Sequence, residues 1–134
     1  MRAERGEIWV PENREDPESR SISLAYVRFP STNPDPGSPI VYLAGGPGGS
    51  GIATARGGRF PLFMALREIG DVVAFDQRGT GDSNHIPRCL TEHRLPLDRA
   101  PTLETAVALY RAAAEECAAF WRSEGVDLAG AELG

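Results

Sequence analysis

Two glycine-containing stretches carry the residue types that could do chemistry in this chain. The first, G-G-P-G-G-S-G (45–51), follows the apolar run 40–44, and the second, D-Q-R-G-T-G-D-S (76–83), begins on the last residue of the apolar segment 71–76. Glycine lets a backbone approach a ligand without a Cβ in the way. The first stretch could therefore present N–H groups to a phosphate or to the oxyanion of an acyl-transfer reaction.

Three interpretations of the first stretch are open, and the simplest is a flexible linker or tight turn. A dinucleotide fingerprint, G-x-G-x-x-G, fits residues 46–51, with Asp76 as the acid that would bind a ribose. Against it, Gly57 and Gly58 would break the helix that such glycines should open, and Asp76 lies about 30 residues past Gly46 where about 20 is usual. The third interpretation is an oxyanion loop, in which one lost donor typically costs about 2.7–4 kcal/mol of barrier.

The second stretch favours the oxyanion interpretation, because it places an acid, a base and two glycines in a sharp turn at a strand end. These residues are Asp76, Arg78, Gly79 and Gly81. The alternative is a purely structural role, in which an ion pair between Asp76 and Arg78 stabilises the turn. Arginine would suit such a partly buried pair because its planar fork binds a carboxylate through two hydrogen bonds.

Composition excludes several function classes. All 14 cationic residues are arginine, so a Walker-type P-loop, a Schiff base and a Ser-Lys dyad are excluded. The net charge of −5 disfavours a nucleic-acid surface, which is normally basic. No apolar run approaches the roughly 18 residues of a membrane span. The charged start has no signal-peptide pattern, and the compartment stays open.

No cofactor is predicted, and no metal site. The series His85, Cys89 and His93 has i, i+4 spacing, but Pro87 interrupts any helix there. Structural zinc would need about four ligands in close pairs.

The elements expected to position both stretches form an α/β fold. The order strand, helix, strand between residues 40 and 76 is a βαβ unit, which implies a parallel sheet. The strand at 40–44 is apolar on both faces, as a buried parallel strand would be. The expected strands are 6–10, 21–29, 40–44 and 71–76, and the expected helices are 59–70 and 101–125.

The helix expected at 101–125 has Thr102 as its N-cap and ends at Gly125. Its apolar residues recur on one face, which predicts that Cys117 faces the core or a partner surface. This stripe consists of Leu103, Val107, Tyr110, Ala114, Cys117 and Trp121.

G-G-P-G-G after one strand and D-Q-R-G-x-G-x-S after the next resemble the α/β-hydrolase branch that contains prolyl aminopeptidases and secreted tripeptidyl aminopeptidases. The segments V-P-E-N-R-E-D-P-E-S-R-S-I-S-L-A-Y-V-R-F-P (10–30) and E-C-A-A-F-W-R-S-E-G-V-D-L-A-G (116–130) also resemble that branch. The resemblance covers nearly the whole chain and implies the N-terminal part of an α/β-hydrolase sheet, with about four strands and two main helices. It implies one domain segment over 1–134 without an internal boundary.

The resemblance also implies roles for individual residues. The oxyanion loop would comprise Gly45, Gly46, Pro47, Gly48 and Gly49, with Pro47 after a cis bond. The turn after the fourth strand would be braced by Asp76, Arg78, Gly79, Gly81 and Ser83. Relatives in the secreted subgroup often pair cysteines flanking the helix, which matches Cys89 and Cys117. The alternative is two free buried thiols.

The chain departs from the family at the nucleophile, because it contains no G-x-S-x-G elbow. Ser50 and Ser83 both lack the last glycine of that motif, and His85 and His93 precede the place where the elbow would be. The expected function is an N-terminal fragment of a serine aminopeptidase that releases proline or short peptides. It would supply the oxyanion loop without the triad, and would be inactive alone.

The expected substrate of the complete enzyme is a peptide or small acyl compound. The alternative is a non-catalytic binding or complementation module, associating through an open sheet edge.

Overall fold

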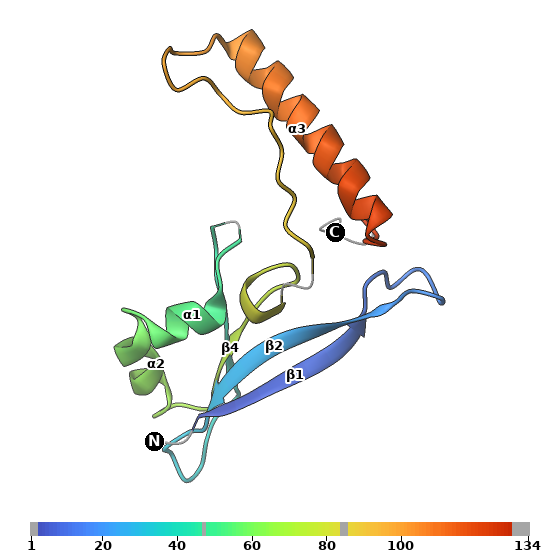
Figure 1. Cartoon of the computed structure of the whole chain (residues 1–134). Helices are drawn as coiled ribbons and strands as arrows, with labels where there is room; N and C mark the ends of the chain where they lie inside the picture. Colours follow the sequence, from blue (N-terminus) through green and yellow to red (C-terminus); the bar gives the residue numbers. More distant parts are fainter. Residues whose placement is uncertain (1–2, 47, 84–85, 130–134) are drawn as a thin grey trace. The chain divides into compact units, whose positions relative to one another are not determined.

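The computed structural model describes residues 3–46, 48–83 and 86–129 (Figure 1). The chain divides into two compact units, one formed by residues 1–11 and 20–85 and the other by residues 12–19 and 86–134. Each unit is described by itself below. The expectation of a single domain without an internal boundary stays a prediction.

A long antiparallel pair begins the first unit. Strand β1 (Glu4–Pro11) pairs with β2 (Ser21–Phe29), with Glu4 opposite Arg28 and Pro11 opposite Ser21. Strand β2 has the predicted bounds, and its side chains alternate between buried and half-buried, so both faces are partly covered as predicted. Strand β1 is longer than the predicted 6–10, because its backbone follows β2 along most of the length of β2.

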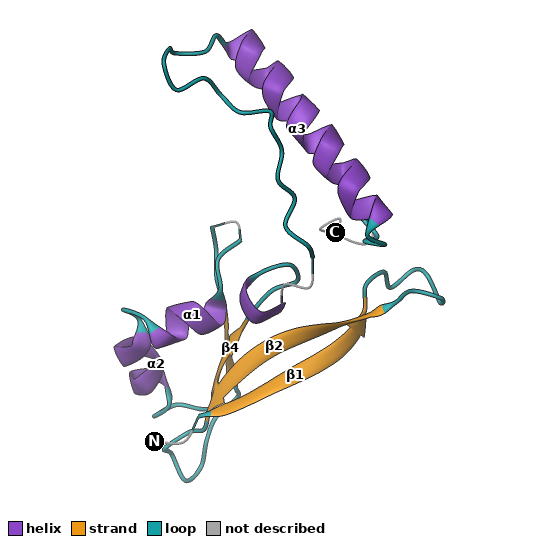
Figure 2. Cartoon of the chain, viewed as in Figure 1, coloured by secondary structure: helices purple, strands orange, loops and turns teal. Residues whose placement is uncertain are grey.

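Two short parallel strands complete the sheet. Strand β3 (Ile40–Leu43) pairs in parallel with β4 (Val72–Phe75), which confirms the βαβ unit. The strand order is β1-β2-β4-β3, and β4 also pairs antiparallel with β2. The sheet is therefore mixed rather than purely parallel, within an α/β fold of the predicted class (Figure 2).

The prediction that β3 is buried on both faces is wrong. Val41 is 59% exposed and Leu43 is 56% exposed, while Tyr42 packs against the core. The reason is the strand order: β3 lies at the edge of the sheet, and within the described residues it pairs with β4 alone. The two inner strands are β2 and β4, and in β4 Val72 and Ala74 are fully buried.

Two helices connect β3 to β4, where one was predicted. Helix α1 (Gly51–Arg56) is followed by α2 (Phe60–Leu66), and Gly57 is the C-cap that ends α1. The predicted helix 59–70 thus exists in shortened form, and a second helix starts directly after the glycine-rich loop. Both helices pack on the same sheet face. The buried core comprises Ala25, Val27, Phe29, Ile52, Ala55, Phe63, Val72 and Ala74.

The second unit contains the longest helix, α3 (Leu103–Ser123). Thr102 is its N-cap, as predicted, because its hydroxyl accepts a hydrogen bond from the Thr105 N–H. No residue of α3 is buried, and the early part of the apolar stripe, at Leu103 and Tyr110, is 82% and 64% exposed. The stripe was predicted to face the core or a partner surface; this half of it covers no core within the chain, and a partner surface stays a prediction. None of the helices in the described ranges is both long enough and apolar enough to cross a membrane.

Candidate functional site

The two glycine-containing stretches meet at one edge of the sheet. Leu43 at the end of β3 lies opposite Phe75 at the end of β4, and the two strands run in parallel. The loop that follows β3 and the turn that follows β4 therefore begin side by side. Open α/β sheets place ligand sites outside the carboxyl ends of their strands.

At three positions of the loop, Gly46, Gly48 and Gly49, a residue with a side chain would be strained or would clash. Gly46 and Gly48 have φ angles of 150° and 84°, in the region that favours glycine. A Cβ on Gly49 would collide with the Gly45 carbonyl oxygen and would lie 3.3 Å from the Ala44 Cβ. Pro47 lies outside the described residues, and the cis bond expected before it stays a prediction.

The first two loop glycines present their backbone to solvent. Gly45 and Gly46 are exposed, and no hydrogen bond from their N–H groups occurs among the described residues. A Cβ on Gly45 would have open space around it.

The carboxylate of Asp76 holds the base of this loop. Asp76 is fully buried, and its Oδ1 accepts hydrogen bonds from the Ser50 hydroxyl at 2.8 Å and the Ile52 N–H at 2.9 Å. Its Oδ2 accepts from the Asp82 N–H at 2.8 Å. The Ser50 hydroxyl oxygen also caps α1 by accepting from the Ala53 N–H at 2.9 Å. The loop, the start of α1 and the turn are thus tied to a single side chain.

Asp76 has different partners from the ion pair considered in the sequence analysis. Its hydrogen bonds come from neutral hydroxyl and amide donors. The guanidinium of Arg78 instead places Nη2 3.4 Å from the Pro11 carbonyl oxygen at the end of β1.

The remaining residues of the turn fit closely around Asp76. The Ser83 hydroxyl donates to the Asp76 carbonyl oxygen at 2.7 Å and accepts from the Ala25 N–H of β2 at 2.8 Å. Gly79 and Gly81 have φ angles of 73° and 48°. A Cβ on Gly81 would collide with Asp76 Oδ2. The structure therefore brings together every predicted turn residue, with Arg78 directed toward β1.

This geometry speaks against the dinucleotide fingerprint. The acid that would bind the ribose, Asp76, is fully buried, and both of its carboxylate oxygens already accept hydrogen bonds from the protein. The helix after the glycines, α1, is only six residues long.

The sequence predictions did not include the role of Ser50 as the residue that caps α1 and donates to Asp76. Two signals in the sequence could have found it: a serine directly before a helix start is a preferred N-cap, and an aspartate at the end of a buried strand needs donors nearby.

Two ionisable residues with shifted pKa values, Asp71 and Arg28, lie at the opposite end of β4 from the glycine loop. The N–H of Ser31 and the guanidinium of Arg28 both donate to the Asp71 carboxylate, and they hold the pKa of Asp71 below its ordinary value. The hydrogen bond to Asp71 in turn raises the pKa of Arg28. This pair fastens β2 to the loop before β4, away from the glycine loop.

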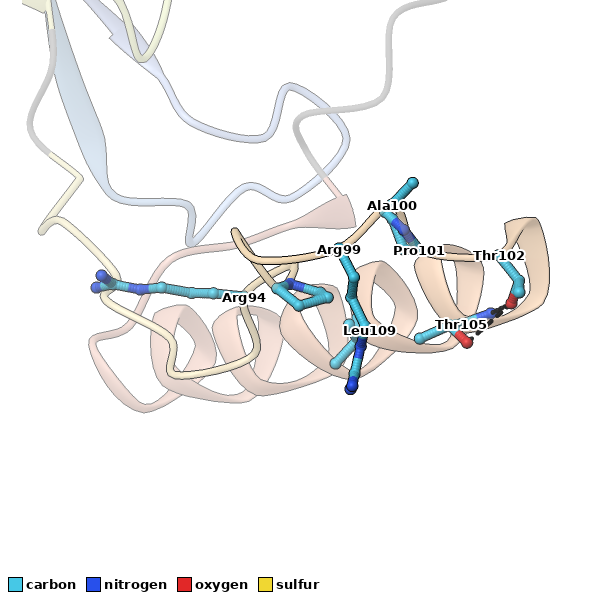
Figure 3. A pocket seen from close by; sticks show the side chains of 8 residues that line it. Arg94, Arg99, Ala100, Pro101, Thr102, Thr105 and Leu109 are labelled. Atoms are coloured by element: carbon cyan, nitrogen blue, oxygen red, sulfur yellow. Dashed lines mark hydrogen bonds between the residues drawn. The ribbon is translucent and has the colours of Figure 1, made fainter.

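The second unit has a hollow of about 430 Å³ that borders the first two turns of α3 (Figure 3). The hydroxyls of Thr102 and Thr105 there bond each other at 2.9 Å. The described residues contain no cluster of three or more His, Cys, Asp or Glu that could hold a metal ion. The hollow is lined by Arg94, Pro96, Arg99, Ala100, Pro101, Thr102, Thr105 and Leu109.

Comparison with known proteins gives a partial similarity. The serine protease Hip1 of Mycobacterium tuberculosis and that of Mycobacterium bovis are each 40% identical to this chain over 78 residues. The matched region is 58% of this chain, and the chain spans about 15% of the length of these curated relatives. No protein-family model matches the chain. The similarity hints at a hydrolase and extends to part of the chain only.

Proposed function

We propose that this chain supplies the oxyanion loop of a serine peptidase of the α/β-hydrolase type, related to the prolyl and tripeptidyl aminopeptidases. The observation that carries the proposal is the pair of exposed residues Gly45 and Gly46 after β3, whose N–H groups donate to no acceptor among the described residues. The partial similarity to a serine protease supports the reaction class.

The chemistry assigned to the loop is stabilisation of negative charge. In peptide hydrolysis a serine attacks the acyl carbon, and the carbonyl oxygen becomes an oxyanion in the tetrahedral intermediate. Two backbone N–H groups in a fixed loop would donate to that oxyanion at no cost of reorganisation. The anchoring of the loop base by Asp76 through Ser50 and Ile52 supports this role.

In this proposal the nucleophile comes from outside these 134 residues, because the sequence contains no G-x-S-x-G elbow, and the acid and histidine follow the nucleophile in the chain order of this fold. The purified 134-residue chain should therefore show no turnover of proline or tripeptide anilides, and saturable turnover would contradict the proposal. The DNA beyond the codon for Gly134 should continue the reading frame into a G-x-S-x-G elbow. A frame without one would also overturn it.

The donor role itself is tested in a protein that carries both this segment and the elbow. Gly45→Pro removes one N–H and should lower kcat on the order of 10²–10³-fold. Gly45→Ala is the matched control, since a Cβ there meets nothing within 4 Å and the N–H remains. Equal activity of the two variants would show that the Gly45 N–H does not stabilise the transition state.

A second candidate, a non-catalytic complementation module, rests on the edge strand. Strand β3 pairs with β4 alone within the described residues, and its Val41 and Leu43 are more than half exposed. Such an edge is a template for pairing with another strand. Size-exclusion chromatography should show concentration-dependent association of the chain, reduced by Val41→Arg. A monomer at all concentrations would argue against this candidate.

A further inference from the structure

Residues 86–101, called the strap here, run alongside α3 in the opposite direction. Three contacts fix this arrangement: Pro87 with Trp121, Cys89 with Cys117, and Thr91 with Glu116. As the residue number rises along the strap, its partner on the helix falls. All three contacts involve the C-terminal half of α3.

The polar contacts between described residues of the strap and α3 include one half-buried hydrogen bond and two exposed pairs. The Trp121 Nε1–H donates to the Pro87 carbonyl oxygen at 2.9 Å, in a half-buried position. The Thr91 hydroxyl donates to the Glu116 carboxylate at 2.7 Å, and His93 Nε2 lies 3.4 Å from the same carboxylate, both exposed to solvent. Exposed polar pairs of this kind contribute little to stability.

Apolar packing on α3 is incomplete. No residue of α3 is fully buried, and apolar residues such as Leu109, Ala113 and Phe120 are only half-buried. The hollow of Figure 3 lies between the distal strap and the first turns of the helix. A single helix of this length is marginal in water without a packed face. The Cys89–Cys117 disulfide is therefore the dominant fastening between the strap and α3.

We propose that this disulfide is a redox-controlled latch: its reduction releases the strap and loosens α3, while the sheet of the first unit stays folded. Cys89 and Cys117 are both half-buried rather than fully buried. The reductant is a dithiol. One of its thiolates attacks a cysteine sulfur, and the resulting mixed disulfide is resolved by its second thiol. Two electrons and two protons pass to Cys89 and Cys117, and the dithiol leaves as a disulfide.

The expected size of the effect follows from the loop that the bond closes. The two cysteines are 28 residues apart. Closing a loop of that length stabilises the folded state by an amount that corresponds to a factor on the order of 10² in the opening equilibrium.

Hydrogen exchange with mass spectrometry of the whole chain, with and without dithiothreitol, tests the latch. After reduction, exchange in peptides from the strap and α3 should rise on the order of a hundredfold. Peptides from β2 and β4 should keep their protection. Titration of free thiols checks that the oxidised protein has none and that the reduced protein has two per chain.

Fluorescence gives an independent reading, because the two tryptophans lie in different units. Trp9 is in β1, and Trp121 bonds the strap. In a Trp9→Phe variant the emission should shift to longer wavelength on reduction. In the matched Trp121→Phe variant, where Trp9 is the reporter, it should not change. A Cys89→Ser, Cys117→Ser chain should begin in the loosened state and be insensitive to dithiothreitol.

Two results would overturn the proposal. If the strap and α3 remain protected after complete reduction, the noncovalent contacts hold them and the disulfide is no latch. If β2 and β4 lose protection together with α3, or if the reduced chain aggregates, the disulfide holds the whole fold rather than one unit.

Discussion

The hydroxyl of Ser50 donates a 2.8 Å hydrogen bond to Oδ1 of Asp76, a carboxylate that has no exposed surface. The same hydroxyl oxygen accepts from the first turn of α1. Ser50 therefore acts as a link between the helix that follows the glycine loop and the turn that follows β4. The shape of the candidate oxyanion loop depends on this link.

Removing the link should destabilise the chain. In Ser50→Ala the helix loses its N-cap, which typically costs about 0.5–2 kcal/mol, and Asp76 loses one donor. We expect a lower midpoint of urea unfolding for Ser50→Ala and near-native stability for Ser50→Thr, which keeps the hydroxyl. A Ser50→Ala chain as stable as the parent would show that the link is unimportant.

Replacing the buried Asp76 by asparagine should lower the free energy of unfolding by more than Ser50→Ala does. In Asp76→Asn one amide NH₂ must face groups that are themselves donors: Ser50 and Ile52 on one side, Asp82 on the other. Hydrogen bonds to a charged group contribute about 1.5–3 kcal/mol each, so a loss of at least that size is expected. Asp98→Asn, in the second unit, serves as the control for removal of one negative charge. Equal midpoints for the two variants would contradict the assigned role of Asp76.

A methyl group at Gly81 should disrupt the turn. Gly81 has a φ of 48°, and a Cβ there would collide with Asp76 Oδ2. The matched control is Gly58→Ala, where a Cβ meets nothing within 4 Å. Thermal unfolding should show a large decrease in Tm for Gly81→Ala and little change for Gly58→Ala. The reverse order would mean that the turn is not built around Asp76 as described.

Acid should weaken the sheet through Asp71. The Ser31 N–H and then the Arg28 guanidinium hold the pKa of Asp71 below its ordinary value of 3.8 in the folded chain. A lowered pKa contributes stability that is present above the ordinary value and is lost as the pH falls toward the folded value. Urea titrations between pH 7 and pH 3 should show this loss in the parent chain.

Asp71→Asn is the test of that assignment. The variant should be less stable than the parent at neutral pH, and the stability difference between them should shrink as the pH falls below about 4. A difference that is constant with pH would mean that the Asp71 charge makes no contribution.

Local patterns in the sequence predicted much of the fold. The bounds of β2 follow from the alternation of apolar and polar residues along the strand. The Thr102 cap follows from a threonine directly before the start of α3. Both predictions need only neighbouring residues. The exposure of Val41 depends on which strands flank β3. No local pattern distinguishes an edge strand from a central one when both are apolar.

The site was predictable in part for the same reason. The glycines and Asp76 were conspicuous by type and spacing. Their actual connection runs through Ser50, 26 residues before Asp76 in the chain. Ser50 can be identified as the hydrogen-bond partner of Asp76 only once the parallel pairing of β3 and β4 is known. Charge complementarity alone suggested Arg78, whose guanidinium lies instead against the end of β1.

The strand order has a consequence for how the sheet assembles. Strand β4 lies between β2 and β3, yet it is the last of the four to leave the ribosome. The β1–β2 hairpin can form early because its connection is local, whereas β3 has no neighbour until β4 arrives. Inserting β4 closes two chain loops at once, a step that non-local pairing makes slow. During synthesis, the backbone N–H and C=O groups of β2 and β3 that pair with β4 thus stay unpaired until residues 72–75 have emerged.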